Sequence, residues 1–266
     1  TWLMDEAYCR TFIQENRARY SVFNVLPDNA MYTTARMVLN PSFSPAREHH
    51  TMVDNILDLA DDGGIENLII CIGHNNIVGA VTKLEINFSE ETDVNKHYSE
   101  RTCTVFRPEH FEKELRTLYN KFNGSNIRRI FVPTIPYVTI PPAIRGVNKK
   151  GDSNRADGYY DYYARFWIWD EDFNPDKHPH LTRDDVILLD QIVDRYNEII
   201  KNVASEYGFH VVPVDRYVRA AARRRRGKDL VKPFPPEFID ALRKNEKTAY
   251  LVDSDGQPRL STDYIR

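Results

Sequence analysis

The chain has 266 residues, of which 41% are hydrophobic, 28% charged and 12% aromatic. These fractions are those of an ordinary globular protein, and they exclude the collagen-like, low-complexity and broadly disordered classes. The 36 Lys and Arg residues nearly balance the 39 Asp and Glu residues, which argues against a general nucleic-acid binder. No apolar run approaches the roughly 20 residues that cross a membrane, and the sequence assigns no compartment.

Two elements are expected near the beginning of the chain. Apolar side chains recur at helical spacing over residues 5–19, which favours a helix. Residues 21–26 (SVFNVL) form a short apolar run that is closed by the turn-forming residues 27–29 (PDN). This pattern is typical of a strand that ends in a turn.

A helix over 50–59 and a strand over 67–72 are expected next. The apolar residues of the first segment lie on one helical face, and Gly63 and Gly64 provide its end. Residues 67–72 (NLIICI) are a continuous apolar run of strand length that is followed by glycine. Such a run predicts a central strand that is covered on both faces.

Two further helix–strand pairs follow. A helix over 108–122 keeps its apolar residues on one stripe, and a strand is expected over 127–133. The longest helix begins after Thr182, whose hydroxyl caps it, and a strand follows over 209–214. This alternation predicts a three-layer α/β/α sandwich with a mostly parallel central sheet, built as one domain.

Residues 147–181 interrupt the alternation with a polar loop and a cluster of tyrosine, phenylalanine and tryptophan over 159–169. Aromatic side chains of this kind most commonly build a core. Because the cluster follows a polar loop, a partly exposed lip that holds a carbohydrate or an acyl group is the alternative. The sequence leaves both uses open.

The segment Gly73-His74-Asn75-Asn76 comes directly after the predicted central strand. Sites in parallel sheets form beyond the carboxyl ends of the strands. A glycine there lets the backbone turn sharply, and the Asn75 amide is placed to donate to an anionic oxygen. Glycine and asparagine are also common in ordinary turns, so the spacing alone does not decide between a site and a turn.

Several short motifs, in the same order, resemble the SGNH or GDSL-type hydrolases. Residues 63–81 (GGIENLIICIGHNNIVGAV) resemble the block of that superfamily in which Gly-x-Asn-Asp or Gly-x-Asn-Asn follows a central strand. Residues 132–140 (VPTIPYVTI) resemble the stretch after the next strand. Residues 160–181, which include NPDKHPHL, resemble one bacterial branch, as do the long helix and strand that follow. The resemblance covers about the middle three quarters of the chain.

The resemblance implies a flavodoxin-like sandwich and the hydrolysis of an ester through a serine nucleophile. It makes Asn75 the donor to the oxyanion and Gly73 the residue that opens the turn. Asn76 replaces the more frequent aspartate but agrees with the bacterial branch. A second backbone donor is expected after the earlier strand, at Asp28 or Asn29, although no glycine stands there.

Two catalytic blocks of the superfamily have no counterpart in the expected places. The single Gly-Asp-Ser contains Ser153 and lies in a polar loop, and the nearest approach to Asp-x-x-His contains Asp176 and His178, far from the chain end. We do not combine these three residues into a triad, because a solvated turn and the branch motif explain them.

We therefore expect residues 1–266 to be one SGNH-type domain that is incomplete at both ends, with the serine and the histidine outside this span. The start at Thr1 rather than Met favours the same view. The expected substrate is a small-molecule ester, or an ester of a lipid or an acylated carbohydrate. The alternative is a catalytically inactive binding or scaffold protein that keeps the fold.

No metal and no cofactor are expected. Cys9, Cys71 and Cys103 are widely spaced and form no Cys-x-x-Cys pair. The spacing of His178 and His180 is poor for shared coordination on a helix. Phosphate-binding glycine motifs are absent from the sequence, which disfavours a nucleotide-binding protein.

Overall fold

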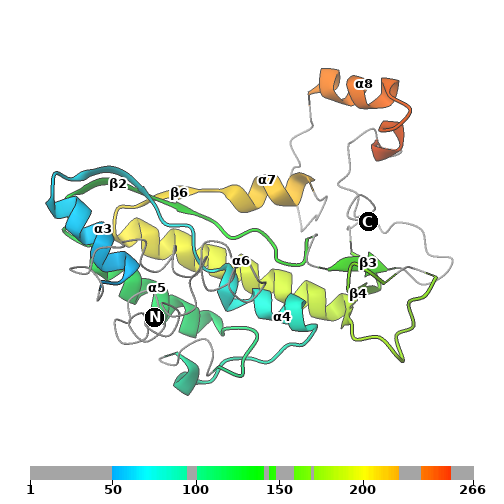
Figure 1. Cartoon of the computed structure of the whole chain (residues 1–266), viewed down its shortest axis with the longest axis horizontal. Coiled ribbons are helices and arrows are strands. Elements are labelled where there is room, and N and C mark those ends of the chain that lie inside the picture. The colour runs from blue at the N-terminus through cyan, green and yellow to red at the C-terminus, as the bar shows by residue number, and fades with distance from the viewer. Residues whose placement is uncertain are drawn as a thin grey trace, which may run out of the picture.

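The computed structural model in Figure 1 describes residues 50–94, 101–140, 144–147, 159–168, 171–221 and 235–252. The helix expected over 5–19 and the strand expected over 21–26 lie outside these residues.

Three parallel strands form the main sheet. They are β1 (Ile65–Ile69), β2 (Ile127–Pro133) and β6 (His210–Val212), in the order β1-β2-β6. Ile69 pairs with Phe131, and Phe131 pairs with His210, so the carboxyl ends of all three strands meet at one edge of the sheet. The predicted mixed α/β class and its parallel sheet are confirmed.

The position of β1 differs from the prediction for residues 67–72. Among the described strands β2 is central, and β1 lies at the edge with one neighbour. Its side chains alternate between two environments: Ile70, just beyond the strand, is buried, whereas Ile69 is 67% exposed. An unbroken apolar run does not reveal how many neighbours a strand has, and among the described residues β1 is an edge strand with Ile69 exposed rather than the expected central strand covered on both faces.

Three long helices occupy the predicted segments. They are α3 (Met52–Asp61), α5 (Pro108–Phe122) and α6 (Arg183–Glu206). The predicted N-cap of α6 is confirmed, because the Thr182 side chain accepts from the backbone N–H of Asp185 while the Asp185 carboxylate accepts from Thr182. Helices α5 and α6 pack against each other, and α6 also contacts β6, so the two helices cover one face of the sheet (Figure 1).

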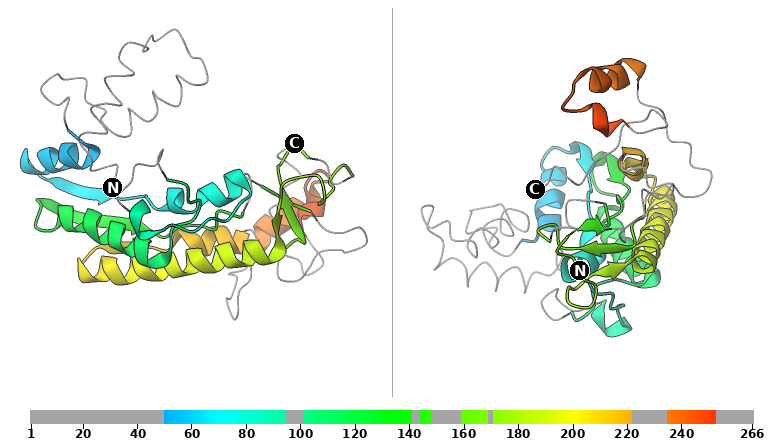
Figure 2. Two further views of the ribbon diagram at one scale, coloured as in Figure 1. Left: turned by 90° about the horizontal axis from the view of Figure 1, so that it is seen from below. Right: turned by 90° about the vertical axis from the view of Figure 1, so that its right-hand side faces the viewer.

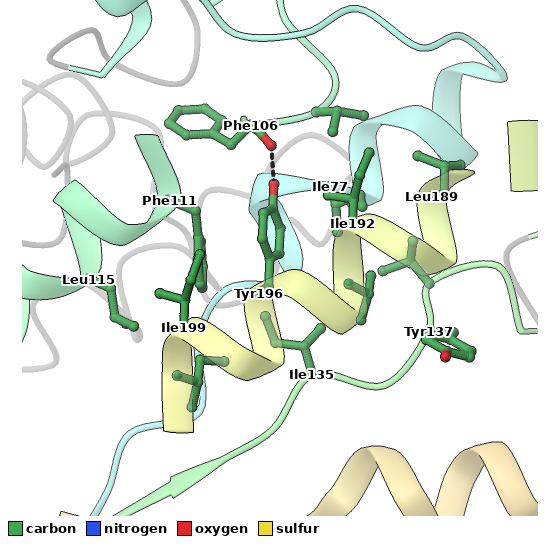
Figure 3. Packing of buried hydrophobic residues seen from close by; sticks show 14 of the residues in the cluster. Ile77, Phe106, Phe111, Leu115, Ile135, Tyr137, Leu189, Ile192, Tyr196 and Ile199 are labelled. Atoms are coloured by element: carbon green, nitrogen blue, oxygen red, sulfur yellow. Dashed lines mark hydrogen bonds between the residues drawn. The ribbon is translucent and has the colours of Figure 1, made fainter. Parts of the chain in front are cut away.

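The core between these helices and the sheet is centred on Tyr196 (Figure 3). Its ring stacks on Phe111 of α5 with the centroids 4.1 Å apart, and its hydroxyl donates to the carbonyl of Phe106. Burial raises the pKa of the Tyr196 hydroxyl well above its ordinary value, so it remains a donor. The contact fixes the segment before α5 against α6.

Several shorter helices were not predicted. They are η3 (His74–Asn76), α4 (Val78–Lys83), η4 (Glu91–Asp93), α7 (Val214–Ala221), α8 (Pro236–Lys244) and η6 (Ala249–Leu251). Helix α4 was missed because a six-residue segment with an internal Gly79 has little helical propensity. A Cβ at Gly79 would lie 3.1 Å from the carbonyl oxygen of Thr104, so close packing explains the glycine.

A second, antiparallel sheet lies at the amino end of α6, opposite the end near α3 (Figures 1 and 2). Its strands are β3 (Arg145–Val147), β4 (Tyr162–Ala164) and β5 (Leu181–Thr182). The segment 147–181, expected as a loop and aromatic insertion, therefore contributes strands. Tyr159 and Tyr163 are buried, as expected of a core, whereas Phe166 and Trp167 are exposed, and the alternative of a lip that holds a ligand stays a prediction.

Candidate functional site

The turn after β1 is built around Gly73. This residue has φ +113°, a left-handed conformation that side chains disfavour. A Cβ at Gly73 would lie 2.5 Å from Cδ1 of Ile135 and 3.2 Å from Cε2 of Phe111. Both the backbone conformation and the close approach of the core therefore require glycine, and η3 can begin at once.

Asn75 lies in the middle of η3, exposed, at the carboxyl end of β1. Its side-chain amide makes no hydrogen bond within the part of the chain that the structure describes. An exposed amide without a partner, on a turn that the core holds in place, is free to donate to an oxygen of a ligand.

Asn76, in contrast, is used by the protein itself. Its Nδ2 donates to Oε2 of Glu114 on α5 at 3.4 Å, and its carbonyl accepts from the backbone N–H of Phe106 at 2.7 Å. An aspartate at position 76 would place a second carboxylate beside Glu114, so the amide suits this position better. The protein's own contacts therefore hold Asn76 in place, whereas its neighbour Asn75 is exposed.

A largely buried ion pair lies behind Asn76. The Arg101 guanidinium donates to Oε1 of Glu114 at 2.9 Å and lies over the ring of Phe106 at 4.5 Å. This pair links the segment before α5 to the helix and to the turn. Sequence reasoning missed it, because an arginine and a glutamate thirteen residues apart carry no pattern that distinguishes them from surface charges.

His74 is half-buried beside Asn75, and its burial lowers the pKa of the imidazole below the ordinary 6.5. The ring is therefore neutral at pH 7 and adds no positive charge to the turn. No motif had assigned a role to it.

The remaining predicted residues either lie outside the described residues or form a local turn of their own. Asp28, Asn29 and Ser153 lie outside the described residues. Asp176 and His178 form a local turn with Asn174, whose Oδ1 accepts from the Asp176 backbone N–H at 2.9 Å and whose own N–H donates to His178 Nδ1 at 3.0 Å.

A serine, a histidine and a glutamate meet elsewhere. Ser89 Oγ lies 2.8 Å from His110 Nδ1, and His110 Nε2 lies 3.2 Å from a carboxylate oxygen of Glu91. Ser89 Oγ already accepts from the backbone N–H of Arg107 at 2.9 Å, so we assign its proton to the bond with His110. These are the groups of a serine hydrolase, and sequence reasoning missed them because the serine and the histidine lie 21 residues apart.

This set is closed to substrates, however. Ser89 is 0% exposed, so no carbonyl carbon can approach its oxygen. The bonds instead fasten the segment around η4 to the first turn of α5. We therefore do not assign catalysis to Ser89.

Within the described ranges, no three His, Cys, Asp or Glu side chains come together as a group that could hold a metal ion. No described helix is both long and apolar enough to span a membrane. A comparison with known protein families, curated proteins and solved structures finds no match to this chain.

Proposed function

We propose that the chain is the body of an SGNH-type serine ester hydrolase with a three-layer α/β/α sandwich. Asn75 is its oxyanion donor, and the nucleophilic serine and the base histidine come from polypeptide outside residues 1–266. The serine attacks the ester carbonyl while the histidine takes its proton, and the Asn75 amide donates to the oxygen that becomes negative.

The observation that carries the proposal is the state of the Asn75 side chain. It is exposed and unbonded among the described residues, and it stands at the carboxyl end of a parallel strand. Sheets of this class place their sites there. An amide that donates to no other described residue can donate to the oxygen on which negative charge develops.

The edge position of β1 also supports the proposal. Among the described strands β1 pairs on one side only, with β2. A further parallel strand on the other side would end level with the Gly73–Asn76 turn, because parallel strands have their carboxyl ends at the same edge of a sheet. A serine after such a strand would lie next to Asn75.

The first test labels the nucleophile in the full-length gene product that contains residues 1–266. A fluorophosphonate reacts only with an activated serine, and mass spectrometry of the labelled peptide identifies that serine. We expect the label on a serine outside residues 1–266. A folded protein that is not labelled, or a label on Ser153, would contradict the proposal, and the former would favour the inactive binding protein.

The second test removes the donor. In the same protein, Asn75→Ala is expected to lower kcat for p-nitrophenyl butyrate by roughly 10²–10³ with little change in KM, since the donor acts mainly in the transition state. Asn123→Ala is the matched control, because Asn123 is an exposed asparagine just before β2, at the opposite end of the sheet. Equal losses in both variants would remove Asn75 from the mechanism.

A further inference from the structure

A closed circuit of contacts surrounds the last residue of the turn that carries the candidate donor. Asn76 donates through Nδ2 to Oε2 of Glu114 at 3.4 Å, and the other oxygen of that carboxylate accepts from Arg101 at 2.9 Å. The Arg101 guanidinium lies over the Phe106 ring, 4.5 Å from its centre. The backbone N–H of Phe106 in turn donates to the carbonyl of Asn76 at 2.7 Å. The circuit therefore begins and ends at the same residue.

This circuit is anchored in the core. Arg101 and Glu114 are largely buried, with 8% and 14% of their side chains exposed. The Phe106 carbonyl accepts from the hydroxyl of Tyr196, which is fully enclosed (Figure 3). The circuit thus joins the turn to both α5 and α6.

The Arg101–Glu114 pair is an inefficient way to stabilise a fold. Taking two charges out of water costs about as much as their attraction returns, so apolar side chains of similar size often serve equally well. Charge-assisted hydrogen bonds are directional, however, and each oxygen of the Glu114 carboxylate holds a different partner. What the pair supplies, and apolar groups could not, is a defined direction for the Asn76 amide.

Asn76 passes this direction to Asn75 through the backbone. The two residues share a peptide bond in η3, whose N–H on Asn76 donates to the Gly73 carbonyl at 3.1 Å. Asn76 is thus held at its N–H, its carbonyl and its side chain. A neighbour that is fixed in this way restricts the backbone from which the exposed Asn75 side chain extends.

We propose that Glu114 and Arg101 are positioning residues for Asn75. They act through Asn76 and touch neither a substrate nor the reacting atoms. The inference rests on the proposed function for its catalytic consequence, because a displacement of about 1 Å in a reacting geometry can cost roughly 10²-fold in rate. The order of the turn does not depend on catalysis and is measured separately.

The main variant removes both charges and keeps the side-chain size. In the full-length gene product that contains residues 1–266, the double variant Arg101→Met/Glu114→Leu is expected to retain its Tm, because apolar groups replace a buried pair. We expect its kcat for p-nitrophenyl butyrate to fall by about tenfold or more, with little change in KM. A pair that served stability alone would leave kcat unchanged in a protein that keeps its Tm.

A second background shows whether this loss passes through Asn75. When Asn75→Ala is already present, adding Arg101→Met and Glu114→Leu is expected to lower kcat by less than about twofold, since the amide that they position is gone. The matched control is Glu112→Leu with Arg116→Met, an ion pair on α5 whose side chains are 39% and 38% exposed. This control is expected to leave kcat unchanged.

The order of the turn gives a readout that needs no activity. By NMR relaxation, the order parameter of the Asn75 backbone N–H is expected to fall from about 0.85 to about 0.6 in the double variant, whereas that of Leu189 within α6 stays high. If the double variant does not fold, Asn76→Ala removes the bond to Glu114 but leaves the ion pair in place, and the same changes in kcat and in order are expected.

The inference is overturned if the folded variant keeps its kcat or the order of the Asn75 N–H. It is also overturned if kcat falls by the same factor in the Asn75→Ala background or in the Glu112→Leu/Arg116→Met control. A turn that loosens in a protein without esterase activity contradicts only the proposed function. A loss of kcat in Asn75→Ala, with none in the double variant, contradicts only this inference.

Discussion

Adjacent residues in the Gly73–Asn76 turn have different tasks. Gly73 permits the turn, Asn76 holds it against α5, and Asn75 is exposed, with an amide that bonds to no residue in the described part of the chain. The Gly-x-Asn spacing after a predicted strand indicated Gly73 as the turn residue and Asn75 as the donor. It did not indicate the support of Asn76 by Glu114, because that contact joins residues 38 positions apart.

His74 makes the stability of this turn depend on pH. Its pKa is lowered by burial, so below about pH 6.5 the unfolded chain binds a proton that the folded chain does not. The unfolding free energy therefore falls as the pH drops from about 6.5 towards the pKa of the folded state, by at most about 1.4 kcal/mol per pH unit for this group.

Thermal unfolding is measured at about pH 7.5 and at about pH 5.5. We expect the Tm of His74→Gln to fall less between these two pH values than the Tm of the unsubstituted protein. Asn75→Ala changes the neighbouring residue without removing a titrating group and is expected to keep the original pH dependence. The same loss of Tm in His74→Gln and in the unsubstituted protein would rule out a contribution from His74.

At the scale of elements, apolar periodicity and capping residues predicted the bounds of those helices and strands that depend on neighbouring residues in the sequence. The expected segments 108–122 and 127–133 coincide with α5 and β2, and Thr182 caps α6 as expected. The position of β1 could not be predicted, because strand order depends on contacts between distant segments. The short helix α4 was missed because its packing, not its propensity, stabilises it.

The cap of α6 can be tested directly. Thr182→Ala removes the side chain that accepts from the Asp185 N–H, and we expect the unfolding free energy to fall by about 1 kcal/mol. Urea denaturation measures this change. Thr117→Ala is the control, since Thr117 is exposed inside α5 and alanine is the better helix former there. A loss in the control as large as in Thr182→Ala would show that the cap contributes nothing specific.

At the scale of the molecule, α6 joins the two sheets. Its carboxyl-terminal part packs along β6, and its amino-terminal part contacts β4 and β5 (Figure 2). The buried Asp190 of α6 accepts from the hydroxyl of Tyr159 at 2.7 Å and from that of Thr139. Hydrogen bonds of this kind connect the aromatic segment to the long helix.

Tyr159→Phe removes one of these donors, and we expect it to lower the unfolding free energy by about 1–3 kcal/mol. The transition should remain a single one, because α6 is common to both sheets. Chemical denaturation followed by both circular dichroism and fluorescence checks both statements. Tyr217→Phe, on an exposed tyrosine, is expected to leave stability unchanged. Unfolding in two steps would show that the antiparallel sheet is independent.

The pairing of β1 with a single described strand bears on how the sheet can grow. On its other side β1 pairs with no described strand, and an unpaired strand edge can accept an extended peptide as a further strand. A strand that pairs there, from this chain or from another molecule, extends the parallel sheet on that side.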